Sequence, residues 1–403
     1  MNPLLLLDLD DTLLKNNIDA FLPHYLSAFS RHVADLIDPD RFVKSLLAGT
    51  REMVENRQPD CTLKEKFESV FYPIAGLQQG DFQATADLFY TQVFPTLREF
   101  TQPIPQAVEF VNEAVARNCR LVIATNPLFP YTAIHQRLSW AELPAERYPF
   151  ELISSYETFH FAKPDPAFFA EVMARVGWPE GPAIVVGDDL ERDIRPGRSL
   201  GLPAFWVVED REPAGDERLT PNAWGSLNQF FPWVDMTPQE NLEPEYHESE
   251  SWLAILRATP AALDSFCRLV DVSLWAARPW AEEWSLTEIL CHMRDVDQEV
   301  NFTRIQQILE LENPFLPGQD TDRWAEARRY REQDGSQALR QFIAVRTHII
   351  NRLEELDTTG WQRPARHAIF GPTHLRELVS IIASHDRLHL QQIYRLIQAL
   401  SPS

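Results

Sequence analysis

The chain has 403 residues, 44% of them hydrophobic and 24% charged, which is enough for two or three globular domains with sizeable cores. Its formal net charge of −22 argues against binding to nucleic acid or to an anionic membrane surface, because both interactions need an excess of basic residues. Four cysteines without paired spacing indicate reduced, mostly buried thiols. No signal peptide or membrane span is recognisable, so we expect a cytoplasmic protein.

An apolar strand is expected at residues 4–7, and the carboxylates of Asp8 and Asp10 follow it directly. Carboxylates beside a hydrophobic core are costly unless a cation or hydrogen-bond donors meet them. In open α/β sheets, ligands sit at the carboxyl ends of the strands. The first strand therefore predicts a ligand site at its end.

Residues 18–99 repeat apolar side chains at three- and four-residue steps, which predicts an all-helical insert. Asp38 before Pro39 is expected to cap one helix, and Thr62 with Glu65 forms a capping box for the next. Asp81 is expected to cap a further helix.

An α/β pattern resumes at about residue 100, with helices at residues 106–117 and after Pro166. Strands are expected at residues 120–124, 152–154, 183–186 and 204–208. This alternation predicts a Rossmann-like parallel sheet with helices on both faces, formed by residues 1–17 and 100–235.

Residues 236–250 are rich in proline and glutamate and read as a linker. Residues 251–403 show no strand pattern and predict an all-α four-helix bundle. Its helices are expected to begin at Thr259-Pro260, after Ser285, near Gln337 and after residues 371–373.

The residues at the predicted strand ends suit phosphoryl transfer. Asp8 can attack phosphorus, and Asp10 can protonate the leaving oxygen and then deprotonate water. Asp8 and Asp188 can share Mg²⁺, a hard cation that prefers oxygen ligands. Lys163 and the Thr125 hydroxyl can offset charge on the phosphoryl oxygens.

These residues resemble the haloacid dehalogenase-like superfamily over about residues 1–235. The matching pieces are Asp8-Leu9-Asp10-Asp11-Thr12, Thr125-Asn126, Lys163-Pro164-Asp165 and Gly187-Asp188-Asp189-Leu190-Glu191-Arg192-Asp193. The resemblance implies a nucleophile at Asp8, an acid/base at Asp10, and phosphoryl binding by Thr125, Asn126 and Lys163. It implies magnesium ligands at Asp8, Asp188 and the backbone carbonyl of Asp10. It also implies that the helical insert closes over a small phosphorylated metabolite.

The superfamily also includes dehalogenases and phosphomutases. The dehalogenase branch lacks the second aspartate, so Asp10 favours a phosphatase, while mutases that keep it remain an alternative. Asp193 is expected to contact Lys163 or a metal-bound water, and Asp189 to support the site beside it. His135 and His160 are expected to be ordinary surface or packing residues.

Three histidines of the predicted bundle form a second candidate site. His292 lies on the helix after Ser285, and His385 and His389 are one turn apart on the last helix. Three imidazoles with an open position suit Zn²⁺ or Ni²⁺. Asp295 is expected to be a solvated surface charge. His367 and His374 are expected in loops.

Residues 283–292 and 385–393 resemble the two signature segments of DinB-like four-helix proteins, and the likeness covers about residues 250–400. In that family one histidine of the second helix and two of the last bind a divalent metal, which implies His292, His385 and His389. Characterised relatives include metal-dependent transferases that act with low-molecular-weight thiols.

The leading hypothesis is a Mg²⁺-dependent phosphatase of small organic phosphate monoesters, working through an aspartyl-phosphate and fused to a metal-binding bundle. One alternative places the principal activity in the bundle, as a metal-dependent thiol transferase or hydrolase. Another is a non-enzymatic sensor of a phosphorylated metabolite, against which the intact Asp8, Asp10 and Lys163 count. The sequence sets neither the physiological substrate nor the oligomeric state.

Overall fold

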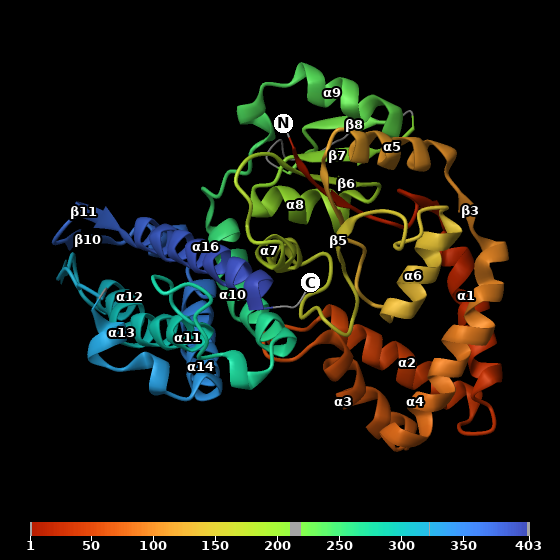
Figure 1. Cartoon of the computed structure of the whole chain (residues 1–403), viewed down its shortest axis with the longest axis horizontal. Helices are drawn as coiled ribbons and strands as arrows, with labels where there is room; N and C mark the ends of the chain where they lie inside the picture. The colour runs from red at the N-terminus through yellow and green to blue at the C-terminus, as the bar shows by residue number, and fades with distance from the viewer. Residues whose placement is uncertain (1, 210–218, 322, 401–403) are drawn as a thin grey trace. The chain divides into compact units, whose positions relative to one another are not determined.

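The computed structural model describes residues 2–209, 219–321 and 323–400 (Figure 1). The chain divides into two compact units. Met1–Val172 with Glu180–Glu245 form the first unit, and Met173–Pro179 with Tyr246–Ser403 form the second. No helix among the described residues is long and apolar enough to span a lipid bilayer.

A six-stranded parallel sheet forms the centre of the first unit, in the order β5-β4-β1-β6-β7-β8. The strands are β1 (Leu4–Leu7), β4 (Arg120–Ile123), β5 (Phe150–Ile153), β6 (Ala183–Gly187), β7 (Ala204–Val207) and β8 (Ala223–Gly225). Leu4 of β1 pairs with Arg120 on one side and Ala183 on the other. All four leucines of β1 are buried because a central parallel strand is covered on both faces.

The helices that follow these strands are α5 (Pro105–Ala116), α6 (Tyr131–Trp140), α7 (Pro166–Arg175), α8 (Arg195–Leu200) and α9 (Phe230–Met236). In Figure 1, α5 and α9 lie on one side of the sheet and α7 and α8 on the other. The predicted fold class is confirmed, although β8 and α9 were not foreseen. The chain runs from β1 to β4 and β5 and then returns to β6, so the carboxyl end of β1 lies where the strand order reverses, which is the usual ligand position.

The helical insert contains α1 (Ile18–His32), α2 (Pro39–Val54), α3 (Leu63–Ala75) and α4 (Gln79–Leu88). The Asp38 carboxylate accepts from the Arg41 amide at 3.0 Å, and Thr62 with Glu65 forms the expected capping box. The expectation for Asp81 is wrong. The helix begins earlier, at Gln79, so Asp81 lies inside the first turn, where its charge complements the helix dipole.

Two short strands close the insert at its base. β2 (Leu14–Lys15) leads into the helices, β3 (Gln102–Pro103) leads out, and they pair antiparallel. The interior of the insert is aromatic, with Phe29 stacked on Phe89 at 3.9 Å between ring centroids. The insert is therefore a packed helical layer tied to the chain just beyond β1.

The second unit is a bundle of α10 (Ser249–Leu269), α11 (Leu286–Asp295), α14 (Gly335–Glu354) and α16 (Leu375–Leu400). The helix that begins after Ser285 continues beyond α11 through a π-helical segment, Val296–Asn301, into α12 (Phe302–Glu310). The Ser285 capping box forms as predicted.

The first bundle helix begins ten residues before the predicted start at Thr259-Pro260. Pro260 lies inside α10, where it removes one backbone hydrogen bond. The helix tolerates this loss because it is buried on several sides, and the Thr259 hydroxyl donates to the Ile255 carbonyl at 2.8 Å.

The expectation of no strands in this unit is wrong. A small sheet joins β9 (Phe315–Leu316), β10 (Pro364–His367) and β11 (Gly371–His374). These strands are two to four residues long, and β10 and β11 each carry a proline, so they leave no alternating pattern in the sequence. His367 and His374, expected in loops, lie at the ends of β10 and β11.

Candidate active site and metal centre

Lys163 binds two carboxylates at the carboxyl edge of the sheet. Its Nζ donates to Asp8 Oδ1 at 2.7 Å and to Asp193 Oδ1 at 2.5 Å, and all three residues are buried. Burial disfavours the charged ammonium, but the two carboxylates outweigh it and raise the pKa of Lys163. The lysine is thus held charged beside Asp8.

Asp188 completes a cluster of oxygen donors with Asp8 and Asp193, whose carboxylate oxygens lie within 4.8 Å of one another. Burial, followed by the charges of Asp8 and Asp193, raises the pKa of Asp188 to about 8. Among the described residues only Lys163 offsets the charge of this cluster, so ionisation of all three carboxyl groups leaves an excess of negative charge. A donor set of hard oxygens with this excess fits Mg²⁺.

Asp10 points to a different neighbourhood. Its Oδ1 accepts from Asn16 Nδ2 at 2.8 Å, and its Oδ2 contacts the guanidinium of Arg137. The carboxylates of Asp8 and Asp10 therefore have separate partners.

Thr125 and Asn126 follow β4 and line the same cavity as Lys163. The Thr125 carbonyl accepts from the Ser154 hydroxyl at 2.7 Å, which joins the ends of β4 and β5. Asn126 Oδ1 accepts from the Lys163 amide at 3.2 Å. Asn126 thus orders the lysine loop while it lines the cavity.

The Asp189 side chain caps the helical turn Leu190–Ile194. Its Oδ1 accepts from the amides of Glu191 at 2.8 Å and Arg192 at 3.1 Å. The Asp189 amide in turn donates to Asp193 Oδ2 at 3.1 Å. A Cβ on Gly187 would lie 2.3 Å from that oxygen, so only glycine leaves room for Asp193.

The loop that carries Lys163 is fixed by a buried pair. His160 Nδ1 lies 2.8 Å from Glu171 Oε1, and neither side chain is exposed. His160 is a packing residue here. His135 lies at the surface with its Nε2 3.3 Å from Glu146 Oε1.

A cavity of about 1010 Å³ opens above the carboxylates and reaches into the helical insert. Its floor includes Asp8, Asp10, Thr125, Lys163 and Asp188. The candidate residues of the sheet edge therefore face one common space large enough for an organic ligand.

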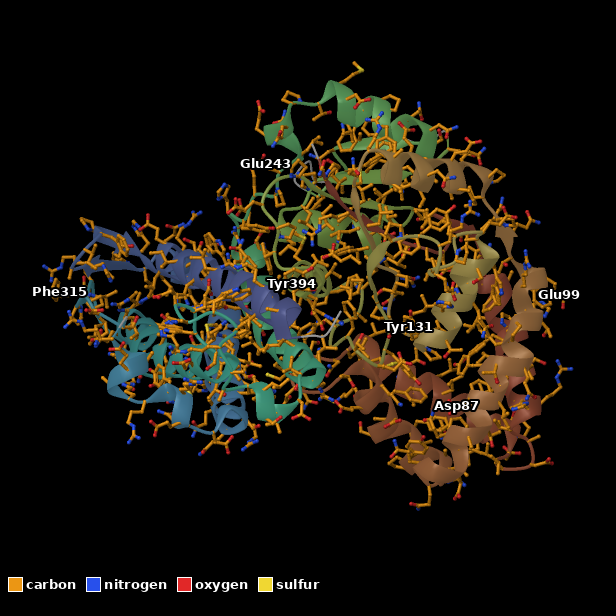
Figure 2. All side chains as sticks on the ribbon, in the orientation of Figure 1. Asp87, Glu99, Tyr131, Glu243, Phe315 and Tyr394 are labelled. Carbon is orange, nitrogen blue, oxygen red and sulfur yellow. The ribbon has the colours of Figure 1, made fainter. Side chains whose placement is uncertain are left out.

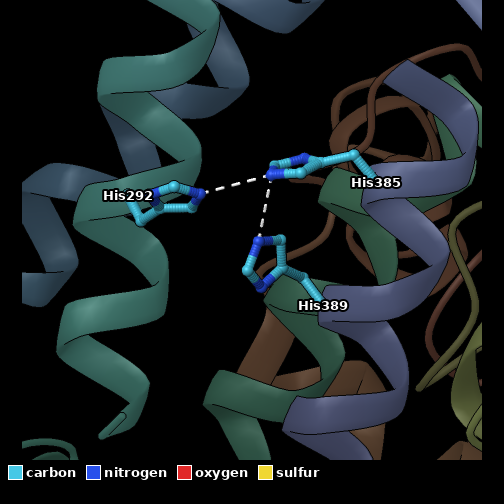
Figure 3. A group of neighbouring side chains, drawn as sticks. All are labelled: His292, His385 and His389. Atoms are coloured by element: carbon cyan, nitrogen blue, oxygen red, sulfur yellow. Dashed lines mark hydrogen bonds between the residues drawn. The ribbon is translucent and has the colours of Figure 1, made fainter. Parts of the chain in front are cut away.

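Three histidines of the second unit converge on one point, as Figure 3 shows. His385 Nε2 lies 3.2 Å from His292 Nε2 and 3.1 Å from His389 Nε2. A tetrahedral zinc site with Zn–N bonds of about 2.0 Å places its nitrogens about 3.3 Å apart, so the spacing fits such an ion.

The protonation of these rings favours metal binding. Burial, together with the neighbouring rings, lowers the pKa of His292 and of His385 to about 3. His389 Nδ1 lies 3.1 Å from Gln392 Oε1, which accepts the ring proton and leaves the Nε2 lone pair free. The lowered pKa values of all three rings favour their neutral form, and their Nε2 atoms are directed at one another.

Two family models match separate parts of the chain. The model for haloacid dehalogenase-like hydrolase matches residues 3–201, and the model for the DinB superfamily matches residues 255–393. The chain joins a haloacid dehalogenase-like domain to a DinB-like domain. Both resemblances drawn from the sequence motifs are confirmed.

Individual proteins are similar to parts of the chain. A phosphoserine phosphatase of Thermus thermophilus is 30% identical over 127 residues, which are 32% of this chain and 49% of that enzyme. The chain thus matches about half the length of that relative. The uncharacterised protein YuaE of Bacillus subtilis is 28% identical over 127 residues, 29% of this chain and 78% of YuaE. A 2-haloacid dehalogenase structure from Pseudomonas syringae is 23% identical with a TM-score of 0.41, over 58% of this chain and 99% of that one.

Arg137 is the residue of the haloacid dehalogenase-like domain that the sequence interpretation missed. It is 2% exposed on α6, and burial lowers its pKa to about 10, against the opposing charge of Asp8. The sequence pattern could have revealed it, because Arg137 lies between the buried Ile134 and Leu138. An arginine on the inward face of a helix needs a charged partner.

The DinB-like domain contains buried charges that the sequence interpretation also missed. Asp295, expected at the surface, is buried and accepts from Arg294 Nε at 2.6 Å and from the Tyr330 hydroxyl at 2.7 Å. Arg346 lies between Asp297 and Asp386, which directly follows His385. Apart from the adjacent Arg294 and Asp295, these partners are 35 to 49 positions apart, a separation that helical periodicity does not reveal.

Proposed function

We propose that the haloacid dehalogenase-like domain is a Mg²⁺-dependent phosphatase of small organic phosphate monoesters. The observation that carries the proposal is the position of Lys163, bonded to Asp8 and Asp193 beside Asp188 at one cavity floor. The likeness to a phosphoserine phosphatase supports phosphorylated substrates. The two-aspartate motif favours a phosphatase over a dehalogenase.

The chemistry follows from the separate surroundings of Asp8 and Asp10. An Asp8 oxygen bonds to phosphorus while the bond from phosphorus to the ester oxygen breaks, and Asp10 donates a proton to that oxygen. Water then attacks phosphorus and gives its proton to Asp10, and the bond to Asp8 breaks to release phosphate. Lys163 and Thr125 hold the phosphoryl oxygens. Bound Mg²⁺, with Asp8 and Asp188 as ligands, supplies charge neutralisation.

For the DinB-like domain we propose a divalent transition-metal site, Zn²⁺ or Ni²⁺, held by His292, His385 and His389. Among the described residues the cluster offers three donors, so one position of a tetrahedral ion stays open for another ligand. This open position allows a second candidate function. That function is a metal-dependent reaction with a low-molecular-weight thiol, since a thiolate is a favourable ligand for such an ion.

Release of phosphate from p-nitrophenyl phosphate tests the phosphatase proposal. We expect Mg²⁺-dependent turnover by the full chain, loss of turnover in Asp8→Asn, and no change in Asp40→Asn, an exposed aspartate of α2. Turnover that survives Asp8→Asn would contradict the proposal. Saturable binding of phosphate esters without turnover would favour the sensor, and transfer of the phosphoryl group to a sugar hydroxyl would favour a mutase.

A further inference from the structure

The cavity above the carboxylate floor is larger than a small metabolite requires. Its volume of about 1010 Å³ lies at the upper end of the roughly 300–1,000 Å³ typical of small-molecule pockets. A three-carbon phosphate ester would fill a minor part of this space, and the upper walls of the cavity would remain in contact with water. The cavity therefore points to a leaving group with substantial bulk.

Most of the lining residues of the helical insert are aromatic or aliphatic. They include Tyr25, Phe29, Leu46, Leu47, Phe67 and Phe82. Burial of an apolar group against such walls is favourable by roughly 25 cal/mol for each Å² removed from water. The walls thus favour binding of a substrate whose alcohol part is apolar.

The charges of the lining oppose a second anionic group on the substrate. The described lining residues include eleven carboxylates and four cations. Each cation has a carboxylate neighbour: Lys163 with Asp8, Arg137 with Asp10, Lys64 with Glu68, and Arg192 with Asp189. Asp87 on α4, labelled in Figure 2, adds negative charge from the insert. A carboxylate or second phosphate on the substrate would thus be repelled by these carboxylates rather than bound by cationic side chains.

The polar groups of this wall include a pair of tyrosine hydroxyls. The hydroxyls of Tyr25 and Tyr90 lie 2.8 Å apart, and burial raises the pKa of both, so they stay neutral. One hydroxyl donates to the other, and the second proton remains to donate to a neutral oxygen. This pair suits a hydroxyl, ether or carbonyl on an otherwise apolar group.

We infer that the substrate is a phosphate monoester whose alcohol part is bulky, largely apolar and free of a second anionic group. This inference rests on the proposed phosphatase function and names its substrate class. The upper cavity then binds the alcohol part of the substrate, while the residues of the floor bind and transfer the phosphoryl group.

The test compares three primary-alcohol monoesters, so that the leaving groups are chemically alike: 3-phenylpropyl phosphate, ethyl phosphate and 3-phosphoglycerate. We expect kcat/KM with Mg²⁺ to be at least about tenfold higher for the phenylpropyl ester, from burial of a ring-sized apolar group. Equal values, or a preference for phosphoglycerate, would overturn this inference alone. No turnover of any of these esters or of p-nitrophenyl phosphate would overturn the phosphatase proposal and this inference with it.

A matched pair of variants locates the selectivity in the cavity. Leu47 and Leu88 are each 48% exposed in the insert, but Leu47 lines the cavity and Leu88 does not belong to its described lining. Leu47→Gln should reduce the preference for phenylpropyl over ethyl phosphate several-fold, and Leu88→Gln should leave it unchanged. The same preference in wild type and Leu47→Gln would contradict recognition by this wall.

Discussion

The buried guanidinium of Arg137 contacts the partly exposed carboxylate of Asp10 in the haloacid dehalogenase-like domain. Asn16 donates to the other oxygen of the same carboxylate at 2.8 Å. An ion pair on one oxygen and a hydrogen bond on the other together fix the direction of the carboxylate. The proposed acid/base is therefore oriented by residues of α6 and of the loop before the insert.

Replacement of Arg137 should impair the proton-transfer step. We expect Arg137→Met to lower kcat for p-nitrophenyl phosphate by about 10²-fold, the lower end of what general acid–base catalysis contributes, with a smaller change in KM. Arg137→Lys should recover part of kcat because it restores the charge. Since the arginine is buried, circular dichroism melting must show that both variants fold. An unchanged kcat in folded Arg137→Met would rule out this role.

Removal of Lys163 should cost both activity and stability. Lys163→Met leaves Asp8 and Asp193 buried without their ammonium partner, so we expect a loss of about 3–5 kcal/mol in unfolding free energy. Urea unfolding measures this loss, and added Mg²⁺ should recover part of it by neutralising the carboxylates. Full stability of Lys163→Met in chelator would show that the ammonium does not compensate these charges.

The raised pKa of Asp188 predicts a pH dependence of stability without metal. An unfolded aspartate titrates near about 3.9, and the folded group titrates at about 8, so the folded state binds more protons between these values. Stability in chelator should therefore fall as pH rises from about 4 to 8, by at most about 1.4 kcal/mol per pH unit from this group. Asp188→Asn should flatten the slope, as should saturating Mg²⁺. Equal slopes in wild type and Asp188→Asn would contradict the assignment.

The histidine trio predicts one divalent transition-metal ion for each chain, in addition to any Mg²⁺ at the carboxylates. His385→Ala should weaken Zn²⁺ or Ni²⁺ binding by at least about tenfold, because it removes the ring that contacts both others. His348→Ala, which changes an exposed histidine of α14, is the control and should bind normally. Metal content after dialysis and the metal-induced rise in Tm both report the result. Retention of the ion in His385→Ala would show that other groups hold it.

The sequence predicted the parts of the molecule that depend on local pattern. Four leucines before Asp8 predict a buried strand with a carboxylate at its end, and the Thr62 and Ser285 boxes predict helix starts. The fold class and both family resemblances follow from such patterns in their order along the chain. The assigned roles of the site residues, and the domain boundaries, remain predictions for the experiments above.

The features that escaped the sequence interpretation depend on distant partners. Arg137 is buried because Asp10 meets it across more than a hundred residues, and Asp295 because Tyr330 and Arg328 reach it. Pro260 continues a helix that local propensity would end, since tertiary packing outweighs one lost hydrogen bond. Rules based on local sequence cannot predict stabilising contacts made by residues that are distant in the chain.

Detection of a phosphoryl group on Asp8 tests the central claim most directly. Asp10→Asn should slow the attack of water, so the covalent intermediate should accumulate during turnover of p-nitrophenyl phosphate with Mg²⁺. Acid quenching followed by peptide mass spectrometry should then find the phosphoryl group on the peptide that carries Asp8, and Asp8→Asn should yield none. Phosphate release by the wild type, with no phosphoryl group on Asp8 in either the wild type or Asp10→Asn, would contradict the account.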